Sequence, residues 1–266
     1  MLLARDPGQV PVGQRRGLVV ESLVVLGLSL GASAVYAILR IIDRLTVNVP
    51  LNQQSSSLNN SVTPDRPWLD LAYQLANIGF AVVPVALALY LLGRVHPPSA
   101  TLSPGRFIGL DVRRPGRDLA GGAALAAMIG IPGLGLYLAA RALGINTQVA
   151  AANLSGAWWT IPVLVLAAVE NAALEEVVMV GYLFTRMRQV GFGVPVVIAV
   201  SALVRGGYHL YQGFGGFAGN LAMGLVLGLV YRRTGRVGPL VVAHAVLDVV
   251  AFIGYTLARD HLSWLR

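Results

Sequence analysis

The sequence contains no cysteine and no lysine. The absence of cysteine excludes disulfide bonds, thiolate catalysis and metal sites with cysteine ligands. All 20 basic residues are therefore arginine. Charged residues are also scarce, at 12% of the chain against about 25% in ordinary soluble domains. With 56% hydrophobic residues and a mean hydropathy of +0.68, the composition predicts an integral membrane protein.

The positive charge of the chain fits a membrane topology better than nucleic-acid binding. The net charge is +8, but most arginines lie at the ends of apolar runs, and no stripe of arginine is interleaved with aromatic residues. Several arginines crowd into residues 93–118, which the positive-inside rule places in the cytoplasm together with the N-terminus. The arginine-only composition, rich in Ala and Gly, favours a bacterial cell membrane, with membrane lipid as the surrounding partner.

Long apolar runs predict an all-α, polytopic membrane protein with a single domain, residues 1–266. Each crossing of a membrane needs about 20 apolar residues. About seven such runs are present, at residues 18–42, 68–92, 119–143, 158–186, 192–210, 214–231 and 237–257. The connections at 45–67 and 144–157 are expected to be external loops. Glu21, near the start of the first run, is expected to be a solvated end residue.

Two adjacent carboxylates, Glu175 and Glu176, interrupt the fourth apolar run. An acidic or basic residue at the centre of a lipid-embedded helix costs about 2.5–3.5 kcal/mol on insertion scales. Such residues therefore need partners or a wet cavity, and they mark functional sites by default. Neighbouring positions on an α-helix point about 100° apart. We therefore expect one glutamate to work at a site while a partner holds the other.

Further polar residues lie on the later runs, and their spacing groups them on shared helix faces. Positions four apart lie on the same face of a helix. Three pairs have this spacing: Asn171 with Glu175, Arg205 with His209, and His244 with Asp248. Three helices can therefore present polar faces to one interior. This arrangement predicts a catalytic cavity among the last four spans.

Taken in chain order, these residues resemble the CPBP family of intramembrane proteases. That family includes the eukaryotic CaaX prenyl endopeptidases and bacteriocin-processing or self-immunity relatives. Its pattern is E-E-x-x-x-R, then F-x-x-x-H, then H-x-x-x-N or H-x-x-x-D. Glu175-Glu176, His209 and His244-x-x-x-Asp248 match this order. The resemblance covers about residues 158–257, which we take as the predicted catalytic core.

The resemblance implies a role for each matching residue. Glu175 is expected to be the general base that activates water, with His209 assisting. His244 and Asp248 are expected to support the oxyanion of the tetrahedral intermediate. Peptide hydrolysis needs both an activated water and a stabiliser of developing negative charge. The implied substrate is a peptide or a membrane-anchored protein, as for the prenylated C-terminal sequences that the eukaryotic relatives cleave.

Two positions depart from the family pattern. Val180 occupies the place of the family's arginine, and Arg205 occupies the place of its phenylalanine. A guanidinium has therefore left one helix and arisen on the next. We expect Arg205 to replace the missing partner and to neutralise Glu176 across the helix interface, within about 6 Å of the glutamates.

The residues leave the metal question and the function class open. Glu175, His209 and His244 form a plausible Zn²⁺ set with an open fourth position, but the H-E-x-x-H motif of zincins is absent. Catalysis by a metal and catalysis by glutamate alone are both compatible with the sequence. The alternative functions are a non-proteolytic scaffold or immunity-type partner with this fold, and a proton-coupled transporter. A protease requires the polar residues to converge on a point that water can reach.

Overall fold

The computed structural model describes residues 6–94, 103–154 and 156–258. Helices dominate this part of the chain, which confirms the predicted all-α membrane class. Its helices are α1 (Val12–Gly27), α2 (Leu30–Thr46), η1 (Leu51–Gln53), α3 (Pro67–Ala81), α4 (Val83–Arg94), α5 (Pro104–Phe107), α6 (Pro115–Ala142), α7 (Thr160–Glu176), η2 (Val177–Tyr182), α8 (Leu183–Val190), α9 (Val194–His209), η3 (Leu210–Gln212), α10 (Phe214–Thr234) and α11 (Gly238–Ala258). Two strands, β1 (Ser55–Asn60) and β2 (Gln148–Asn153), complete the fold.

Within the described residues, fewer helices are long and apolar enough to cross a membrane than the sequence predicts. Five qualify, at Pro67–Arg94, Pro115–Ala142, Val194–Gln212, Phe214–Thr234 and Gly238–Leu257. The pair α1 and α2, bent by 55°, makes a sixth if it counts as one span. The predicted count of about seven included the run 158–186, which is divided between α7, η2 and α8. Its apolar residues from Val177 to Phe184 are buried inside the protein, whereas Leu166 and Val169 in its first half are exposed. The run is not among the candidate spans because α7 has 17 residues, three of them glutamates, before the helix changes to η2.

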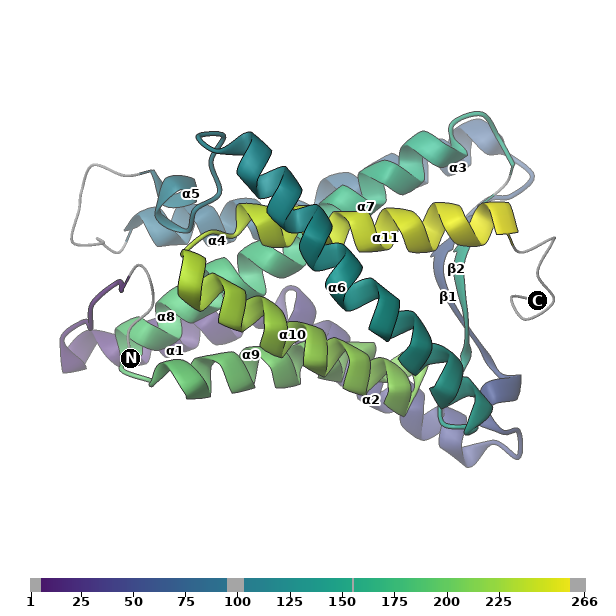
Figure 1. The fold of residues 1–266 in the computed structure, drawn as a ribbon, viewed down its shortest axis with the longest axis horizontal. Helices are drawn as coiled ribbons and strands as arrows, with labels where there is room; N and C mark the ends of the chain where they lie inside the picture. The colour runs from purple at the N-terminus through teal and green to yellow at the C-terminus, as the bar shows by residue number, and fades with distance from the viewer. Residues whose placement is uncertain (1–5, 95–102, 155, 259–266) are drawn as a thin grey trace.

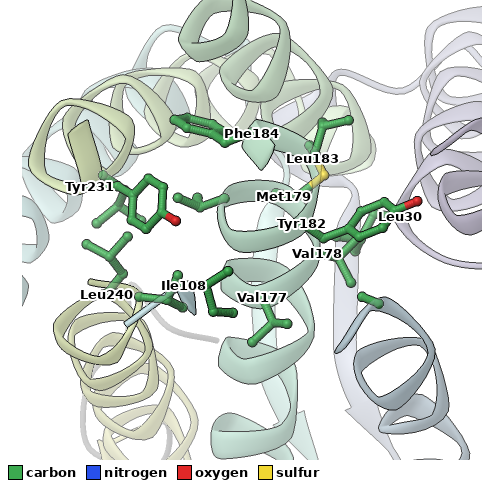
Figure 2. Close-up of a cluster of buried hydrophobic side chains, with 14 of the residues drawn as sticks. Leu30, Ile108, Val177, Val178, Met179, Tyr182, Leu183, Phe184, Tyr231 and Leu240 are labelled. Atoms are coloured by element: carbon green, nitrogen blue, oxygen red, sulfur yellow. The ribbon is translucent and has the colours of Figure 1, made fainter. Parts of the chain in front are cut away.

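The π-helix η2 lies at the centre of the main hydrophobic core. Figure 2 shows side chains of η2 and the start of α8 surrounded by Leu30 of α2, Ile108, Tyr231 of α10 and Leu240 of α11. Around this core, α9 packs on α10 and on α2, while α11 packs on both α6 and α7. Figure 1 shows α6 crossing α11 diagonally. The later helices therefore meet around one interior.

Small residues let these helices approach closely, as expected for helices packed in lipid. A side chain at Gly224 of α10 would come within 2.9 Å of the Ala202 Cα and within 3.2 Å of the Arg205 Cδ. A side chain at Gly122 of α6 would come within 2.4 Å of Val242 on α11. Glycine at these two positions is what permits the contacts of α9 with α10 and of α6 with α11.

A two-stranded parallel sheet occupies the connections predicted as external loops. Ser55 pairs with Gln148 and Asn60 with Asn153. The Ser56 hydroxyl bonds to the Thr147 hydroxyl at 2.8 Å and donates to the Tyr211 carbonyl at 3.1 Å. The sheet lies at the end of the molecule opposite to α5 and α8 (Figure 1). It fixes the turn that follows α9, and so supports one wall of the site described next.

Candidate active site

Glu175 and Glu176 are the last two residues of α7, directly before the π-helix η2. A π-helix bonds each carbonyl to the amide five residues on, and it occurs frequently at functional sites. Gly181 within η2 lies so close to Ile108 that a Cβ there would come within 2.8 Å of its Cδ1. Dense packing therefore holds the helix immediately after the two carboxylates.

Arg205 of α9 bridges both glutamates. Its Nη1 donates to Glu175 Oε2 at 3.1 Å, and its Nη2 donates to Glu176 Oε1 at 2.7 Å. All three side chains are buried. The contact between Arg205 and Glu176 that the sequence predicted is present, and the guanidinium absent at Val180 is replaced from the next helix. One cation thus offsets part of the negative charge of two buried carboxylates, a balance that buried charges require.

The two glutamates occupy different environments. Glu176 is fully buried, and its Oε1 also contacts His244 Nδ1 at 2.8 Å. Glu176 Oε2 finds no hydrogen-bond partner among the described residues. Glu175 instead lines a large cavity. This division agrees with the expectation that one glutamate faces the site while partners hold its neighbour.

His244 of α11 joins the glutamates to the other polar residues of the site. Because its Nδ1 faces a carboxylate, that nitrogen carries a proton. Its Nε2 lies 3.9 Å from Glu175 Oε2 and 3.7 Å from Asp248 Oδ2. Asp248 Oδ2 in turn accepts a hydrogen bond of 2.8 Å from the Asn171 amide. The structure therefore links all three predicted helix faces.

His209 is the last residue of α9, where a tight turn follows. Its Nδ1 lies 3.0 Å from the Arg205 carbonyl. A carbonyl only accepts hydrogen bonds, so Nδ1 carries the proton and Nε2 offers a lone pair. The turn depends on Gly213, whose φ of 115° is strained for other residues, and a Cβ there would meet the Asn146 backbone at 2.7 Å. The backbone thus fixes both the position and the tautomer of His209.

Tyr208 is a site residue that the sequence analysis missed. Its buried hydroxyl donates to Glu175 Oε2 at 2.6 Å, and its ring lies 4.7 Å from the His209 ring. Tyr208 follows Arg205 by three positions, so the two share a helix face. The spacing is a sequence signal for this residue, but tyrosine is common in apolar runs and does not by itself indicate a site.

A cavity of about 1660 Å³ contains the exposed edge of this site. Glu175, His209, His244 and Asp248 all line it. Most of the wall is apolar, but its helices are not confined to the predicted core, because α2 and α6 also contribute. The predicted location among the last four spans is therefore incomplete. Four of the five predicted catalytic residues nevertheless share one space, and the fifth, Glu176, does not line the cavity.

The residues do not fit a metal ion in their present arrangement. Within the described part of the chain, the atoms of Glu175, Glu176 and His244 gather within 4.8 Å of one another, but His209 of the predicted Zn²⁺ set is not in this group. The Arg205 guanidinium already binds both carboxylates, and His244 Nδ1 directs its proton toward Glu176. A metal ion held by these oxygens would lie beside a fixed positive charge. The site is balanced by arginine instead.

Comparison with known proteins gives a partial match. Residues 157–250 match the family model described as Type II CAAX prenyl endopeptidase Rce1-like. This range lies almost wholly within the predicted core 158–257, and it confirms the resemblance found from the sequence. No curated protein and no solved structure shows a significant match to the chain.

Proposed function

We propose that this membrane protein, whose residues 157–250 match the Rce1-like family, is an intramembrane endopeptidase that cleaves a membrane-associated peptide or protein. The observation that carries the proposal is the convergence of Glu175, His209, His244 and Asp248 on one cavity. A buried packing cluster has no need to open onto a space large enough for a peptide segment. The catalytic core is residues 158–257, within a single membrane domain 1–266.

Glu175 is the general base of the proposed reaction. Its Oε2 is held by Tyr208 and Arg205, so the orientation of the carboxylate is fixed. Its Oε1 makes no hydrogen bond to any described residue and is available to a water molecule in the cavity. The Nε2 lone pair of His209 accepts the second proton of that water as a hydrogen bond. Positioned proton transfer of this kind contributes about 10²- to 10⁴-fold to a rate.

His244 and Asp248 serve the developing oxyanion in different ways. An ionised carboxylate only accepts hydrogen bonds, so Asp248 cannot bind the oxyanion itself. It lies 3.7 Å from His244 Nε2 and is held in turn by Asn171. A protonated Nε2 of His244 is the donor to the oxyanion, and Asp248 with Asn171 orients it. Preorganised donors of this type stabilise the tetrahedral intermediate.

Glu175 both takes up and returns the proton that the reaction transfers. Water attacks the carbonyl carbon of the substrate while its proton passes to Glu175. The tetrahedral intermediate then collapses, the C–N bond breaks, and Glu175 returns the proton to the leaving amine. The products are a carboxylic acid and an amine, and Glu175 is again a carboxylate. Arg205 remains paired with Glu176 throughout and keeps that carboxylate from competing for the proton.

The surroundings of the site favour a substrate that comes from the bilayer. The cavity wall is mainly apolar, and the helices that form it include those long enough to cross a membrane. A water-soluble peptide gains little free energy from entering a cavity with an apolar wall. A lipid-anchored or membrane-embedded segment, by contrast, already lies in the bilayer beside these helices. We also propose, from the arginine pattern, that the N-terminus is cytoplasmic and that the protein is bacterial.

Proteolysis is tested by exposing a library of membrane-anchored peptides to the purified protein and identifying the products by mass spectrometry. The wild type is compared with Glu175→Ala and with a chelator-treated sample. We expect cleavage by the wild type, with or without chelator, and none by the variant. Loss of cleavage on chelation would overturn the metal-free mechanism. Equal cleavage by Glu175→Ala would overturn the assignment of the base. A wild type inactive on every peptide would favour the scaffold alternative.

A further inference from the structure

A second cavity, of about 620 Å³, lies between the start of α6, the end of α10 and the turn that joins α10 to α11. We call it the arginine cavity because Arg114, Arg117, Arg233 and Arg236 line it. Met128 of α6 lines both this space and the active-site cavity. Nothing in the proposed hydrolysis uses the arginine cavity, so its chemistry requires a separate explanation.

The acidic residues near this cavity are already occupied. Arg236 donates to Asp118 Oδ2 at 2.6 Å and to Asp111 Oδ1 at 3.1 Å. Asp118 is the one acidic residue that lines the cavity. By contrast, the side chains of Arg114, Arg117 and Arg233 are exposed and form no hydrogen bond or ion pair with any other described residue. Three positive charges therefore face this space without compensation from the protein.

The remainder of the wall is apolar and follows the helices into the membrane. Leu125 and Met128 of α6 and Val230 of α10 line it, and α6 and α10 are both long enough to span a bilayer. Arg117 and Met128 are separated by 11 positions on α6, which corresponds to about 16 Å at the rise of an α-helix. This is about half of the hydrocarbon thickness of a membrane. The cavity thus runs from the level of lipid headgroups into the acyl-chain region.

We infer that the arginine cavity binds an anionic phospholipid. The uncompensated guanidinium groups hold the headgroup phosphate, and an acyl chain lies along the apolar faces of α6 and α10. Arginine forks match phosphate oxygens in geometry and charge. Basic pockets between membrane helices on the cytoplasmic side are known to bind lipid headgroups. A free phosphate ion would use the arginine end and leave the apolar wall empty, so the lining favours the lipid.

The test is a titration of the purified full-length protein in detergent with phosphatidylglycerol or with zwitterionic phosphatidylcholine, followed by native mass spectrometry. The variant is Arg117→Gln with Arg233→Gln. The matched control is Arg16→Gln with Arg94→Gln, which removes the same charge from exposed positions outside the cavity. Loss of each arginine near an anionic surface is expected to weaken binding about fivefold. We expect the variant to bind phosphatidylglycerol about 30-fold more weakly, the control to match the wild type, and phosphatidylcholine to bind weakly to all three.

Three results would overturn the inference. Equal weakening in the control would mean that general surface charge, rather than this cavity, attracts the lipid. If the wild type bound phosphatidylcholine as tightly as phosphatidylglycerol, the arginines would not determine which lipid binds. Displacement of phosphatidylglycerol by an equal concentration of inorganic phosphate would identify a phosphate site in place of a lipid site. Lipid binding is measured without any substrate, so each outcome is independent of whether the protein is a protease.

Discussion

Two glutamates in this protein have the same kinds of partner but different surroundings. Glu175 accepts hydrogen bonds from a tyrosine, Tyr208, and an arginine, Arg205. Glu21 of α1 likewise accepts from Tyr182 at 2.8 Å and from Arg186 at 2.7 Å. The environment differs: Glu175 lines the candidate active-site cavity beside two histidines, whereas Glu21 joins α1 to η2 and α8 and does not line that cavity. An arginine and a tyrosine on a glutamate are therefore not sufficient for the proposed active site, which also requires the cavity and its histidines.

The largest difference between the two groups is expected on removal of the arginine. Arg205→Met removes the guanidinium that pairs with both buried carboxylates, and breaking a buried ion pair costs about 3–5 kcal/mol. Arg186→Met leaves one carboxylate whose side chain is 21% exposed, so water compensates in part. We expect the free energy of unfolding to fall further for Arg205→Met. Thermal unfolding of both variants in the same detergent measures this.

The double variant Arg205→Met with Glu176→Met provides the control for that comparison. It removes a positive and a negative charge together, so most of the lost stability is expected to return while the peptide cleavage does not. A fall in stability that is equal for Arg205→Met and Arg186→Met would contradict the account, because the two arginines would then be equivalent structural residues.

Removal of the tyrosine hydroxyl is expected to have a smaller and more selective effect. Tyr208→Phe deletes the 2.6 Å hydrogen bond that orients Glu175. We expect kcat to fall about 10- to 100-fold with little change in KM, because one hydrogen bond to a charged group contributes about 1.5–3 kcal/mol. Tyr182→Phe deletes the equivalent bond at Glu21 and is expected to leave kcat unchanged. A similar kcat for both variants would show that the cavity environment does not distinguish the two glutamates.

The smallest effect concerns a third arginine group, at the turn before α11. Hydrogen bonds from Arg236 hold the pKa of Asp111 below its ordinary value. A carboxyl with a depressed folded-state pKa stabilises the fold above its unfolded pKa of about 3.9, and this contribution is lost as the pH falls through the folded value. We expect the Tm advantage of the wild type over Asp111→Asn to be present at pH 6 and to shrink toward pH 3. If the Tm advantage of the wild type grew as the pH fell, the folded-state pKa of Asp111 would be raised rather than lowered, which would contradict the account.

The sequence predicted the helices and part of the site for identifiable physical reasons. Long apolar runs specify membrane helices whatever their tertiary contacts, so most helix positions were predictable. The contact between Arg205 and Glu176 was predictable because a buried carboxylate pair needs a cation, and the usual position held Val180. These predictions depended on composition and charge balance, both of which can be read from the amino-acid sequence alone.

Other features depend on contacts between distant parts of the chain. The parallel pairing of β1 with β2 joins two segments rich in Ser, Asn and Ala, which have weak strand propensity. The π-helix η2 carries no sequence pattern that separates it from an α-helix. Glu21 was expected to be solvated, but it pairs with Arg186, 165 positions away. The run 158–186 is not a candidate span because three glutamates and the change from α7 to η2 interrupt it. Apolar sequence alone also does not distinguish its buried part, Val177–Phe184, from a lipid-facing helix.

The most direct test of the central claim is the rate of cleavage by Glu175→Gln and Glu21→Gln, measured side by side on one substrate with the Tm of each variant. The two substitutions neutralise glutamates with the same kinds of donor, so they differ only in the surroundings of the carboxylate. If Glu175 activates water, its variant loses about 10²- to 10⁴-fold in kcat at a Tm close to that of the wild type, and Glu21→Gln keeps its kcat. A kcat for Glu175→Gln equal to that of Glu21→Gln would contradict the account.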